Sequence, residues 1–432
     1  MTFEAISVVG LLLFLLLTGM PVGFALLVSS SIGLWWITDL ETLLGVMEIA
    51  PYEQIASFSL SAIPMFILMA EFLTAGKFTE SIFTAFHRWL GHLRGGLISA
   101  TVGGGVMLAA ISGSSSASAG TLSSAAYPEM KRLGYDDGFS TGALAIVGTL
   151  ALLIPPSIGL ILYGILTETS VKSLLLAGIL PGLLTACGYL ATIYWRIKVN
   201  PSIAPVATTQ FSRQDKLQAL ANTWPVILLM VLIFVMIYSG IVTPTEAGAS
   251  GAFLACLLGV IKRTLSFSGI QSALLNATRI SAMIFAIIIG SSLFGVFLTL
   301  TGVAQELIVS IEQSGLSTAM ILLAVLALYI LLGFFLDQLA IIILTLPLVF
   351  PLMSSLDFNA VWLGIIIVKT AEIGLVSPPM GLNVFIVSNI TRVSPITVFR
   401  GVMPFLLMDL VVLALLVVFP EITLYIPEIS AQ

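Results

Sequence analysis

The sequence predicts an all-α polytopic membrane protein built from two inverted repeats. Of its 432 residues, 59% are hydrophobic and only 9% are charged, whereas soluble globular domains carry about a quarter charged residues. Apolar stretches of about 20 residues, the length that spans a bilayer, recur along the chain. Two long segments also match each other in the same order. These three observations give the fold class.

The apolar stretches are of two kinds. The regions 96–127 and 318–353 are interrupted by small or polar residues, whereas the other stretches run unbroken. The chain begins without a basic segment ahead of its first apolar stretch, so we expect a membrane helix there and not a cleaved signal peptide. Continuous spans are expected at 5–18, 21–38, 54–75, 139–167, 173–195, 222–242, 245–262, 278–300, 360–390 and 401–420.

The charged residues indicate an orientation. Of the 16 Lys and Arg residues, Lys369 lies within a span and Lys172 on the opposite side, which leaves 16 − 2 = 14 for one side. Because basic loops stay in the cytoplasm, both termini are predicted outside. The net charge of −5 argues against a nucleic-acid partner. The loops expected outside hold Asp39, Glu41, Glu48, Glu53, Glu246, Glu306, Glu312 and Asp357.

An internal repeat relates the two halves of the chain. The sequence "LIPPSIGL" at 153–160 matches "VSPPMGLN" at 376–383, which pairs Pro155 with Pro378 at an offset of 378 − 155 = 223. A single match can arise by chance, but several matches in the same order indicate a duplicated unit. Further pairs are Gly178 with Gly401, Gly113 with Gly333 and Pro128 with Pro347.

The two repeats are expected upside down relative to each other. The amphipathic segment 77–94 is basic and cytoplasmic, whereas its counterpart 303–314 is acidic and outside. Inverted repeats are typical of secondary transporters, which hold substrate and ions near the membrane midplane where helices break. The predicted domains are 1–53 (N-terminal scaffold spans), 54–196 (first repeat), 197–277 (cytoplasmic linker and scaffold spans) and 278–432 (second repeat).

The Ser-rich stretch "SGSSSAS" at 112–118 lies where the chain is expected at membrane depth. Irregular backbone survives there only inside protein or beside water. Its flanks are both cytoplasmic and too short for two full spans, so we predict a re-entrant hairpin with its tip at 113–118. Hydroxyls at the tip, such as those of Ser114 and Ser116, can contact an anionic substrate or a small cation. The alternative is a small-residue helix contact.

The region 331–352 occupies the same place in the second repeat and contains Asp337 within an apolar run. An ionisable residue at membrane depth is costly and suggests a function as proton site, cation partner or acceptor for the hairpin tip. The alternative is a structural role, capping the second helix of the hairpin.

Tandem prolines interrupt one predicted span in each repeat. Proline removes a backbone donor and frees carbonyl groups upstream, so the spans are expected to be discontinuous helices. The carbonyls of 151–154 and 374–377 can bind Na⁺. The helix N-termini near Ser157 and 380–383 can face a carboxylate. Simple helix kinks are the alternative.

The remaining polar residues suggest no chemistry of their own. Lys369 and Glu372 are three residues apart and can neutralise each other, while Glu71 and Asp409 are expected near an interface or a partner. Two His and two Cys residues give no metal cluster or catalytic relay. We therefore do not expect an enzyme.

At these motifs the chain resembles the large membrane subunit of tripartite ATP-independent periplasmic (TRAP) transporters. The resemblance rests on "ISGSSSASAGTLSSAAYPEMKRLGYD", "LIPPSIGLILYGILTETS", "LGFFLDQLAIIILTLPLVFPL" and "GLVSPPMGLNVFIVSNIT", and it covers nearly the whole chain. It implies a Na⁺-driven, elevator-type importer of organic acids such as dicarboxylates, sialic acid or other sugar acids. It also implies a small membrane subunit, an extracytoplasmic substrate-binding protein, and a bacterial or archaeal cytoplasmic membrane with its lipid.

The resemblance also implies site residues. Ala151 stands where relatives often have Gly, and a ligand role of the backbone carbonyl tolerates this change. Ser118 stands where relatives often have Asp or Thr, which puts a role of its side chain in doubt. The substrate is expected near Ser116, Asp337 and Asn383. The first Na⁺ site would involve Ser112, Ser115, Ala151, Ile154 and Pro156, and the second Gly333, Gly374, Ser377 and Met380.

Three other functions were weighed against a tripartite importer. A stand-alone ion-coupled dicarboxylate or citrate carrier is the nearest, and it differs by needing no binding protein. An ion channel is disfavoured by the absence of a ring of pore-lining charges. A membrane enzyme would need a catalytic constellation, and the sequence contains none.

Overall fold

The computed structural model describes residues 3–205, 211–313 and 315–431. Within these residues every regular element is a helix and none is a strand. Eight of the described helical segments are long and apolar enough to cross a membrane. The prediction of an all-α, multi-pass membrane protein is thus confirmed. Part of the predicted linker, residues 206–210, lies outside the described residues.

Five helices lie outside the matching segments of the sequence. One of them, α3, was not predicted: its acidic residues were assigned to a loop. The helix starts after Asp39, whose carboxylate accepts a hydrogen bond from the Thr42 N–H at 2.7 Å, and such a cap stabilises a helix start. The five helices are α1 (Phe3–Leu17), α2 (Val22–Ile37), α3 (Leu40–Ile55), α13 (Arg213–Tyr238) and α14 (Pro244–Ile261).

The first unit, α4 to α12, contains an arm helix, a helical hairpin and a broken helix. Its elements are α4 (Ala62–Ala75), α5 (Phe78–Leu90), α6 (Gly96–Ser112), α7 (Ser115–Arg132), α8 (Asp137–Val147), α9 (Leu150–Leu153), α10 (Ile158–Leu166), α11 (Val171–Ala177) and α12 (Ile179–Val199). Short 3₁₀ turns precede and follow it at Phe58–Ser61 and Pro201–Ile203.

The second unit, α15 to α22, repeats this order. The predicted boundary at residue 278 falls inside its first helix, and the C-terminal helix was not predicted. Its elements are α15 (Phe267–Leu300), α16 (Val303–Gln313), α17 (Thr318–Gly333), α18 (Gln338–Ser355), α19 (Ala360–Val376), α20 (Leu382–Thr391), α21 (Pro395–Val418) and α22 (Glu421–Ala431).

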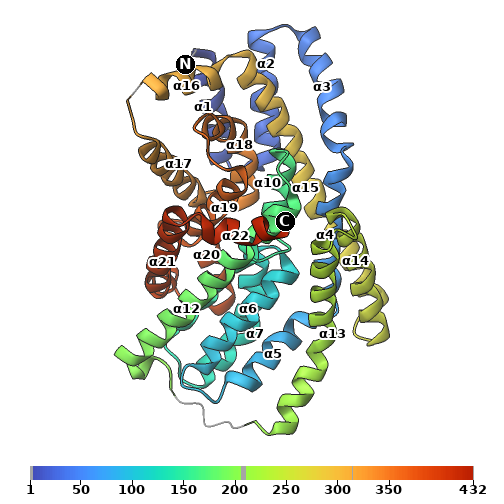
Figure 1. The fold of residues 1–432 in the computed structure, drawn as a ribbon, viewed down its shortest axis with the longest axis vertical. Coiled ribbons are helices and arrows are strands. Elements are labelled where there is room, and N and C mark those ends of the chain that lie inside the picture. The colour runs from blue at the N-terminus through green and yellow to red at the C-terminus, as the bar shows by residue number, and fades with distance from the viewer. Residues whose placement is uncertain (1–2, 206–210, 314, 432) are drawn as a thin grey trace.

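The two hairpins approach each other from opposite ends of the molecule. In the view of Figure 1, α5, α6 and α7 lie in the lower half and α16, α17 and α18 in the upper half. The broken helices lie between them. This arrangement is what two units of opposite direction produce.

Helix caps correct the register of the repeat. Ser114 is the N-cap of α7 and Asp337 is the N-cap of α18, at an offset of 337 − 114 = 223. With this offset Pro128 pairs with Pro351 (351 − 128 = 223) and not with Pro347, as the sequence alone suggested. The reason is that four residues separate α17 from α18 and only two separate α6 from α7, so the offset changes at the tip.

The discontinuous helices are confirmed in both units. The chain leaves helical geometry at Ile154 (φ −77°, ψ 122°) and at Ser377 (φ −85°, ψ 143°), each directly before a Pro–Pro pair. Both Pro–Pro peptide bonds are cis. The two breaks therefore have the same local geometry, which a pair of unrelated kinks would not require.

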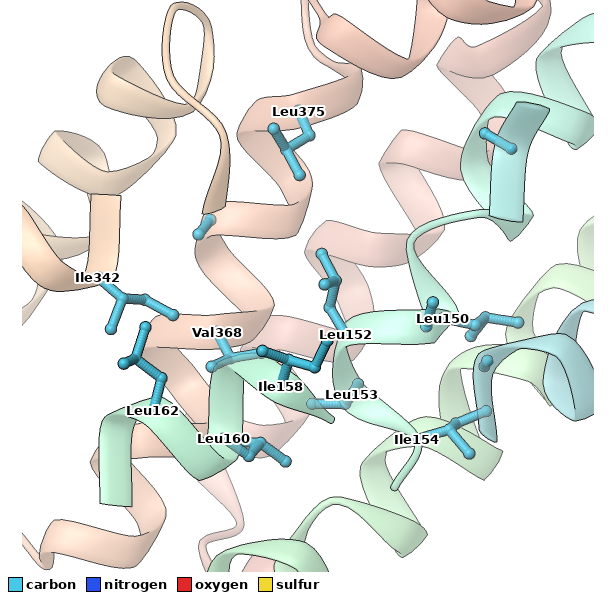
Figure 2. Close-up of a cluster of buried hydrophobic side chains, with 14 of the residues drawn as sticks. Leu150, Leu152, Leu153, Ile154, Ile158, Leu160, Leu162, Ile342, Val368 and Leu375 are labelled. Carbon is cyan, nitrogen blue, oxygen red and sulfur yellow. The ribbon is translucent and has the colours of Figure 1, made fainter. Parts of the chain in front are cut away.

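The core joins the two units around the first break. Figure 2 shows Leu152 and Ile158, from either side of that break, gathered with Ile342 of α18 and Val368 of α19. All four side chains are buried. The irregular segment is thus enclosed by protein, as backbone at membrane depth must be.

Candidate functional site

The two hairpin tips meet at one cavity of about 340 Å³. Ligand pockets typically measure about 300–1,000 Å³, so the cavity is large enough for a small molecule. It lies between both hairpins and the helices α4, α5 and α15. The polar residues among its lining are Glu71, Thr74, Thr79, Ser112, Ser114, Ser115, Ser116, Ser118, Thr121, Asp337 and Gln338.

The lining of this cavity is rich in oxygen atoms and poor in cations. Of the described residues that line it, Glu71 and Asp337 carry carboxyl groups and none is Lys, Arg or His. Glu71 accepts a hydrogen bond from the Asn276 side chain at 3.2 Å. The sequence analysis placed Glu71 near an interface or a partner. It lines the cavity, and Asn276 is its partner. An anionic ligand here would need hydroxyl and N–H donors or an accompanying cation.

The first tip is a tight turn between α6 and α7. Gly113 has φ +54°, a conformation that glycine adopts without strain. Ser114 caps α7 by accepting a hydrogen bond from the Ala117 N–H at 3.4 Å. The hydroxyls of Ser112 and Ser118 lie 2.5 Å apart, so position 118 supports the tip through its side chain.

A hydrogen bond between the units holds the first tip from behind. The Asn383 amide donates to the Ser115 hydroxyl at 2.6 Å and to the Ala145 carbonyl at 3.3 Å. Asn383 is fully buried and is not among the cavity-lining residues. The structure therefore places it behind the tip, against Ser115 of the predicted first Na⁺ site and outside the cavity lining; its place beside the substrate stays a prediction.

The second tip is capped by Asp337. Its carboxylate accepts hydrogen bonds from the N–H groups of Leu339 at 3.0 Å and Ala340 at 3.2 Å. The capping role, one of the two alternatives from the sequence, is confirmed. Asp337 lines the cavity as well, so a functional role is compatible with the cap.

Gln338 is a candidate residue that the sequence reasoning missed. It is 2% exposed, it lines the cavity, and neither atom of its carboxamide has a hydrogen-bond partner. A buried unpaired amide is costly, which is expected where a ligand supplies the missing partner. Its position directly after Asp337 in an apolar run was the available signal.

The predicted carbonyl ligands occupy equivalent positions in the two units. Gly374 corresponds to Ala151 (374 − 151 = 223) and Ser377 to Ile154 (377 − 154 = 223). Pro155 has no N–H to donate to the Ala151 carbonyl, which is thereby freed from the helix pattern.

Ser157, predicted near a substrate carboxylate, makes its hydrogen bonds within the first break. It is fully buried, donates a very short hydrogen bond to the Leu152 carbonyl, and caps α10 by accepting from the Leu160 N–H at 3.2 Å. It is not among the residues lining the cavity. The structure therefore uses its hydroxyl to shape the break.

Each tip touches a broken helix. A Cβ atom on Gly113 would lie 3.4 Å from the Pro156 carbonyl oxygen, and one on Gly333 would lie 2.6 Å from Gly374 Cα. The structure thus brings Gly333 and Gly374 of the predicted second Na⁺ site together. Met380 is 47% exposed and is not among the cavity-lining residues.

The oxygen atoms around the tips are ligands that suit an alkali cation better than a transition metal. In the described part of the chain, no three His, Cys, Asp or Glu residues gather into a metal cluster. Backbone carbonyl and hydroxyl oxygens of broken helices are the ligands that transporters offer to Na⁺.

A wider cavity of about 970 Å³ adjoins the first. Both are lined by Thr74, Thr79, Ala117 and Thr121, so they lie side by side at the first tip. The wider cavity is lined by α5 and α7 and carries charged residues at its rim. Burial lowers the pKa of the His87 imidazole in this wall, which favours its neutral form. The charged and titratable lining residues are Glu80, His87, Arg88, Glu129 and Arg132.

Asp409 has a partner, one of the two alternatives expected from the sequence. It is fully buried and its carboxylate lies 2.7 Å from the Lys369 ammonium. Glu372 is 3.4 Å from the same ammonium. The predicted neutralisation of Lys369 by Glu372 is therefore the weaker of two contacts.

Residues 9–422 match the family described as tripartite ATP-independent periplasmic transporter, DctM component. The chain belongs to this family and is the large permease component of a TRAP transporter, not an enzyme. The C4-dicarboxylate TRAP transporter large permease protein of Pseudomonas aeruginosa is 35% identical, over 88% of this chain and 89% of that protein. The sialic acid TRAP transporter large permease protein of Vibrio cholerae is 31% identical, over 96% of each.

A solved structure shares the fold. The Alcanivorax borkumensis YdaH transporter, whose crystal structure revealed an unusual topology, superposes with a TM-score of 0.65 over 88% of this chain and 90% of that one. The two sequences are only 11% identical, so this likeness concerns the fold alone.

Proposed function

We propose that this permease imports an organic acid together with Na⁺, receiving the substrate from an extracytoplasmic binding protein. The observation that carries the proposal is the single cavity between the two hairpin tips. It is lined by hydroxyls, an unpaired amide and two carboxyl groups, with no basic side chain among its described lining residues. Such a site would hold an anion through these donors, with a cation offsetting the negative charge.

The substrate side of the proposed site consists of hydrogen-bond donors. Ser114 and Ser116 present hydroxyls, and the amide of Gln338 can both donate and accept. The N-terminus of the 18-residue helix α7 adds N–H groups and a partial positive charge at the same tip. These groups would bind a carboxylate, and Gln338 would bind a neighbouring polar group.

The cation side would use the predicted oxygen ligands. The first Na⁺ site is proposed around Ser112, Ser115 and the carbonyls of the first break, and the second around Gly333, Gly374 and Ser377. Na⁺ bound beside the tips would offset the negative charge of Asp337 and of the substrate. Substrate binding would then depend on Na⁺, which is what couples the two fluxes.

The remaining parts of the proposal concern the assembly and the membrane. The family description names a tripartite, periplasmic system, which supports a small membrane subunit and a periplasmic binding protein as partners. The charge pattern supports a bacterial inner-membrane protein with both termini outside. Hairpins and broken helices would move together as one elevator domain against α2, α13 and α14.

The named relatives support a carboxylate substrate. One carries C4-dicarboxylates and another sialic acid by name, and both substrates bear carboxyl groups. A stand-alone carrier is the competing function, and it would transport without a binding protein.

Reconstitution tests the proposal directly. The chain is placed in liposomes together with the small membrane subunit and the binding protein of its transport system. Uptake of radiolabelled succinate, malate and N-acetylneuraminate is measured with an inward Na⁺ gradient, with K⁺ in place of Na⁺, and without the binding protein. We expect uptake of one carboxylate only when Na⁺ and the binding protein are both present.

Two results would contradict the proposal. Uptake that stays the same when K⁺ replaces Na⁺ would show that Na⁺ is not the coupling ion. Uptake at the full rate without the binding protein would establish the stand-alone carrier. The matched control is a Gly10→Ala permease, because a Cβ atom there meets nothing within 4 Å.

A further inference from the structure

A charged cluster is fully enclosed between three helices. Lys369 and Glu372 lie on α19, Asp409 on α21 and Tyr189 on α12, and all four are 0% exposed. The Lys369 ammonium donates to Asp409 at 2.7 Å and to Glu372 at 3.4 Å. The Tyr189 hydroxyl lies 2.8 and 2.9 Å from the two oxygens of the Asp409 carboxylate.

The cluster reaches the broken helix of the first unit. The Thr149 hydroxyl lies 3.3 Å from that of Tyr189, and it is also 2.7 Å from the Ile146 carbonyl. Thr149 directly precedes α9. Along this chain of contacts, side chains link the first unit (Thr149, Tyr189) to the second (Asp409, Lys369).

Both ends of the chain of contacts lie next to proposed Na⁺ ligands. Thr149 is two residues before Ala151, and Glu372 is two residues before Gly374. Ala151 and Gly374 are equivalent positions of the two units. The cluster therefore spans from one proposed cation site to the other through the protein interior, away from the cavity.

Stability alone does not account for such a cluster. Taking charged groups out of water costs about as much free energy as their attraction in a buried ion pair gives back. Apolar residues of similar size at the same positions often stabilise a fold equally well. The cluster holds two carboxyl groups for one ammonium, and Glu372 Oε1 has no hydrogen-bond partner. What buried polar groups can provide is one defined arrangement of the helices that carry them.

We propose that Lys369, Asp409, Tyr189 and Glu372 are positioning residues that hold the two broken helices in fixed relation, so that Na⁺ at one proposed site favours Na⁺ at the other. None of the four is exposed, so they act through the helices and touch neither ion nor substrate. The inference rests on the proposed function, because it needs two Na⁺ sites.

The test compares two buried tyrosines in the reconstituted complex. Tyr189→Phe removes the hydroxyl that joins Asp409 to Thr149. Tyr329→Phe is the matched control: Tyr329 is also fully buried, and its hydroxyl lies 2.5 Å from the Thr345 hydroxyl within hairpin 2. Initial uptake is measured against external Na⁺, and the half-saturating concentration and Hill coefficient are fitted. Protein content and melting temperature are recorded for each variant.

For Tyr189→Phe we expect a Hill coefficient falling toward 1 and a several-fold higher half-saturating Na⁺ concentration at unchanged protein content. Tyr329→Phe is expected to keep the wild-type curve. A second variant, Lys369→Gln with Glu372→Gln and Asp409→Asn, removes every charge at nearly constant volume, so it leaves no unpaired charge to prevent folding. It is expected to lose cooperativity like Tyr189→Phe.

The outcomes separate this inference from the function it rests on. Wild-type uptake that ignores Na⁺ would overturn the proposed function. Cooperative wild-type uptake with unchanged curves in Tyr189→Phe and in the neutral triple variant would overturn only the positioning role. A lower melting temperature of Tyr189→Phe with an unchanged Na⁺ curve would also overturn the positioning role.

Discussion

The second helices of the two hairpins, α7 and α18, are both 18 residues long and both begin at a side-chain cap, but their surroundings differ. On α7, Gly120 and Ser124 line the cavity of about 970 Å³. The equivalent residues of α18, Ile343 and Pro347, line a cavity of only about 280 Å³ against α15. Small residues on α7 thus face open space where bulky residues on α18 face a helix.

This difference shows which side of the shared site is open. The Ser291 hydroxyl of α15 donates to the Ile343 carbonyl at 2.7 Å, which ties hairpin 2 to its neighbour. The larger cavity connects the tips with the end of the molecule that carries Arg88 and Arg132. Under the proposed orientation this is the cytoplasmic side, so the proposed site would be open toward the cytoplasm.

The first residues of the two helices differ as well. Ser115 and Gln338 are equivalent (338 − 115 = 223), and so are Leu160 and Asn383 (383 − 160 = 223). Asn383 bonds Ser115, but Leu160 has no polar group for Gln338. Hairpin 1 is therefore held by the other unit, whereas hairpin 2 keeps a free amide at the cavity.

The largest effect is expected from the cap of hairpin 2. Asp337→Asn keeps the cap, since Asn caps as well as Asp, but removes a charge in the cavity. A charge-assisted hydrogen bond contributes about 1.5–3 kcal/mol, so initial uptake should fall about 10- to 100-fold with protein content unchanged. Ser114→Ala removes the longer cap of hairpin 1 and one neutral hydrogen bond to the substrate, so uptake should fall less, by about tenfold at most. Equal losses of uptake in Asp337→Asn and Ser114→Ala would show that the two caps contribute equally to transport.

The next comparison concerns the glycines at the tips. Gly333→Ala forces a Cβ atom to within 2.6 Å of Gly374 Cα, so a backbone must shift, at a cost of about 1–3 kcal/mol in the free energy of unfolding. Gly113→Ala meets the Ile158 side chain at 3.0 Å and the Pro156 carbonyl oxygen at 3.4 Å, an ordinary contact, and costs about 1–2 kcal/mol from its left-handed conformation. Gly295→Ala is the control, with one neighbour at 3.9 Å. Thermal unfolding in detergent should rank Gly333→Ala lowest; a melting temperature like that of Gly295→Ala would refute the close crossing.

Cysteine labelling sharpens the contrast between the two cavities. In a chain with Cys187 and Cys256 replaced, Ser124→Cys and Pro347→Cys place thiols at equivalent positions of α7 and α18. We expect a hydrophilic maleimide to modify Ser124→Cys several times faster, because Ser124 is exposed and Pro347 only partly so. Faster reaction at position 347 would mean that the open side is assigned to the wrong hairpin.

The smallest effect is expected at Gln338. Gln338→Leu removes an amide without a partner, so substrate-free protein should gain about 1 kcal/mol in the free energy of unfolding. Substrate affinity should fall up to about tenfold, the worth of one hydrogen bond. Gln338→Glu, which keeps the shape, is the matched variant for the affinity measurement. A loss of stability with unchanged affinity would mean that Gln338 is structural.

The local features of this fold were predictable, because each depends on a few adjacent residues. The tandem prolines require broken helices at 155 and 378, and the Ser-rich stretch marks the first tip. The register of the second hairpin was predicted incorrectly, since Phe334, Phe335 and Leu336 add residues at the tip without any distinctive pattern.

Contacts between distant segments were not predictable in this way. Lys369 and Asp409 are 40 residues apart, and only the packing of α19 on α21 brings them to 2.7 Å. Asn383 and Ser115 are 268 residues apart, and their hydrogen bond depends on how the two units face each other. The helix α3 was missed because its three glutamates, with Asp39 at the cap, are typical of a loop when the packing of the helix is unknown.

The central claim is that the two tips form one Na⁺-coupled site. It is tested most directly by the Na⁺ dependence of uptake in Ser115→Ala, which removes a hydroxyl at the first proposed Na⁺ site and its bond to Asn383. We predict a half-saturating Na⁺ concentration raised about tenfold, the effect of losing about 1.4 kcal/mol of cation binding, with the same amount of protein in the membrane. A Na⁺ curve identical to that of the wild type would contradict the claim.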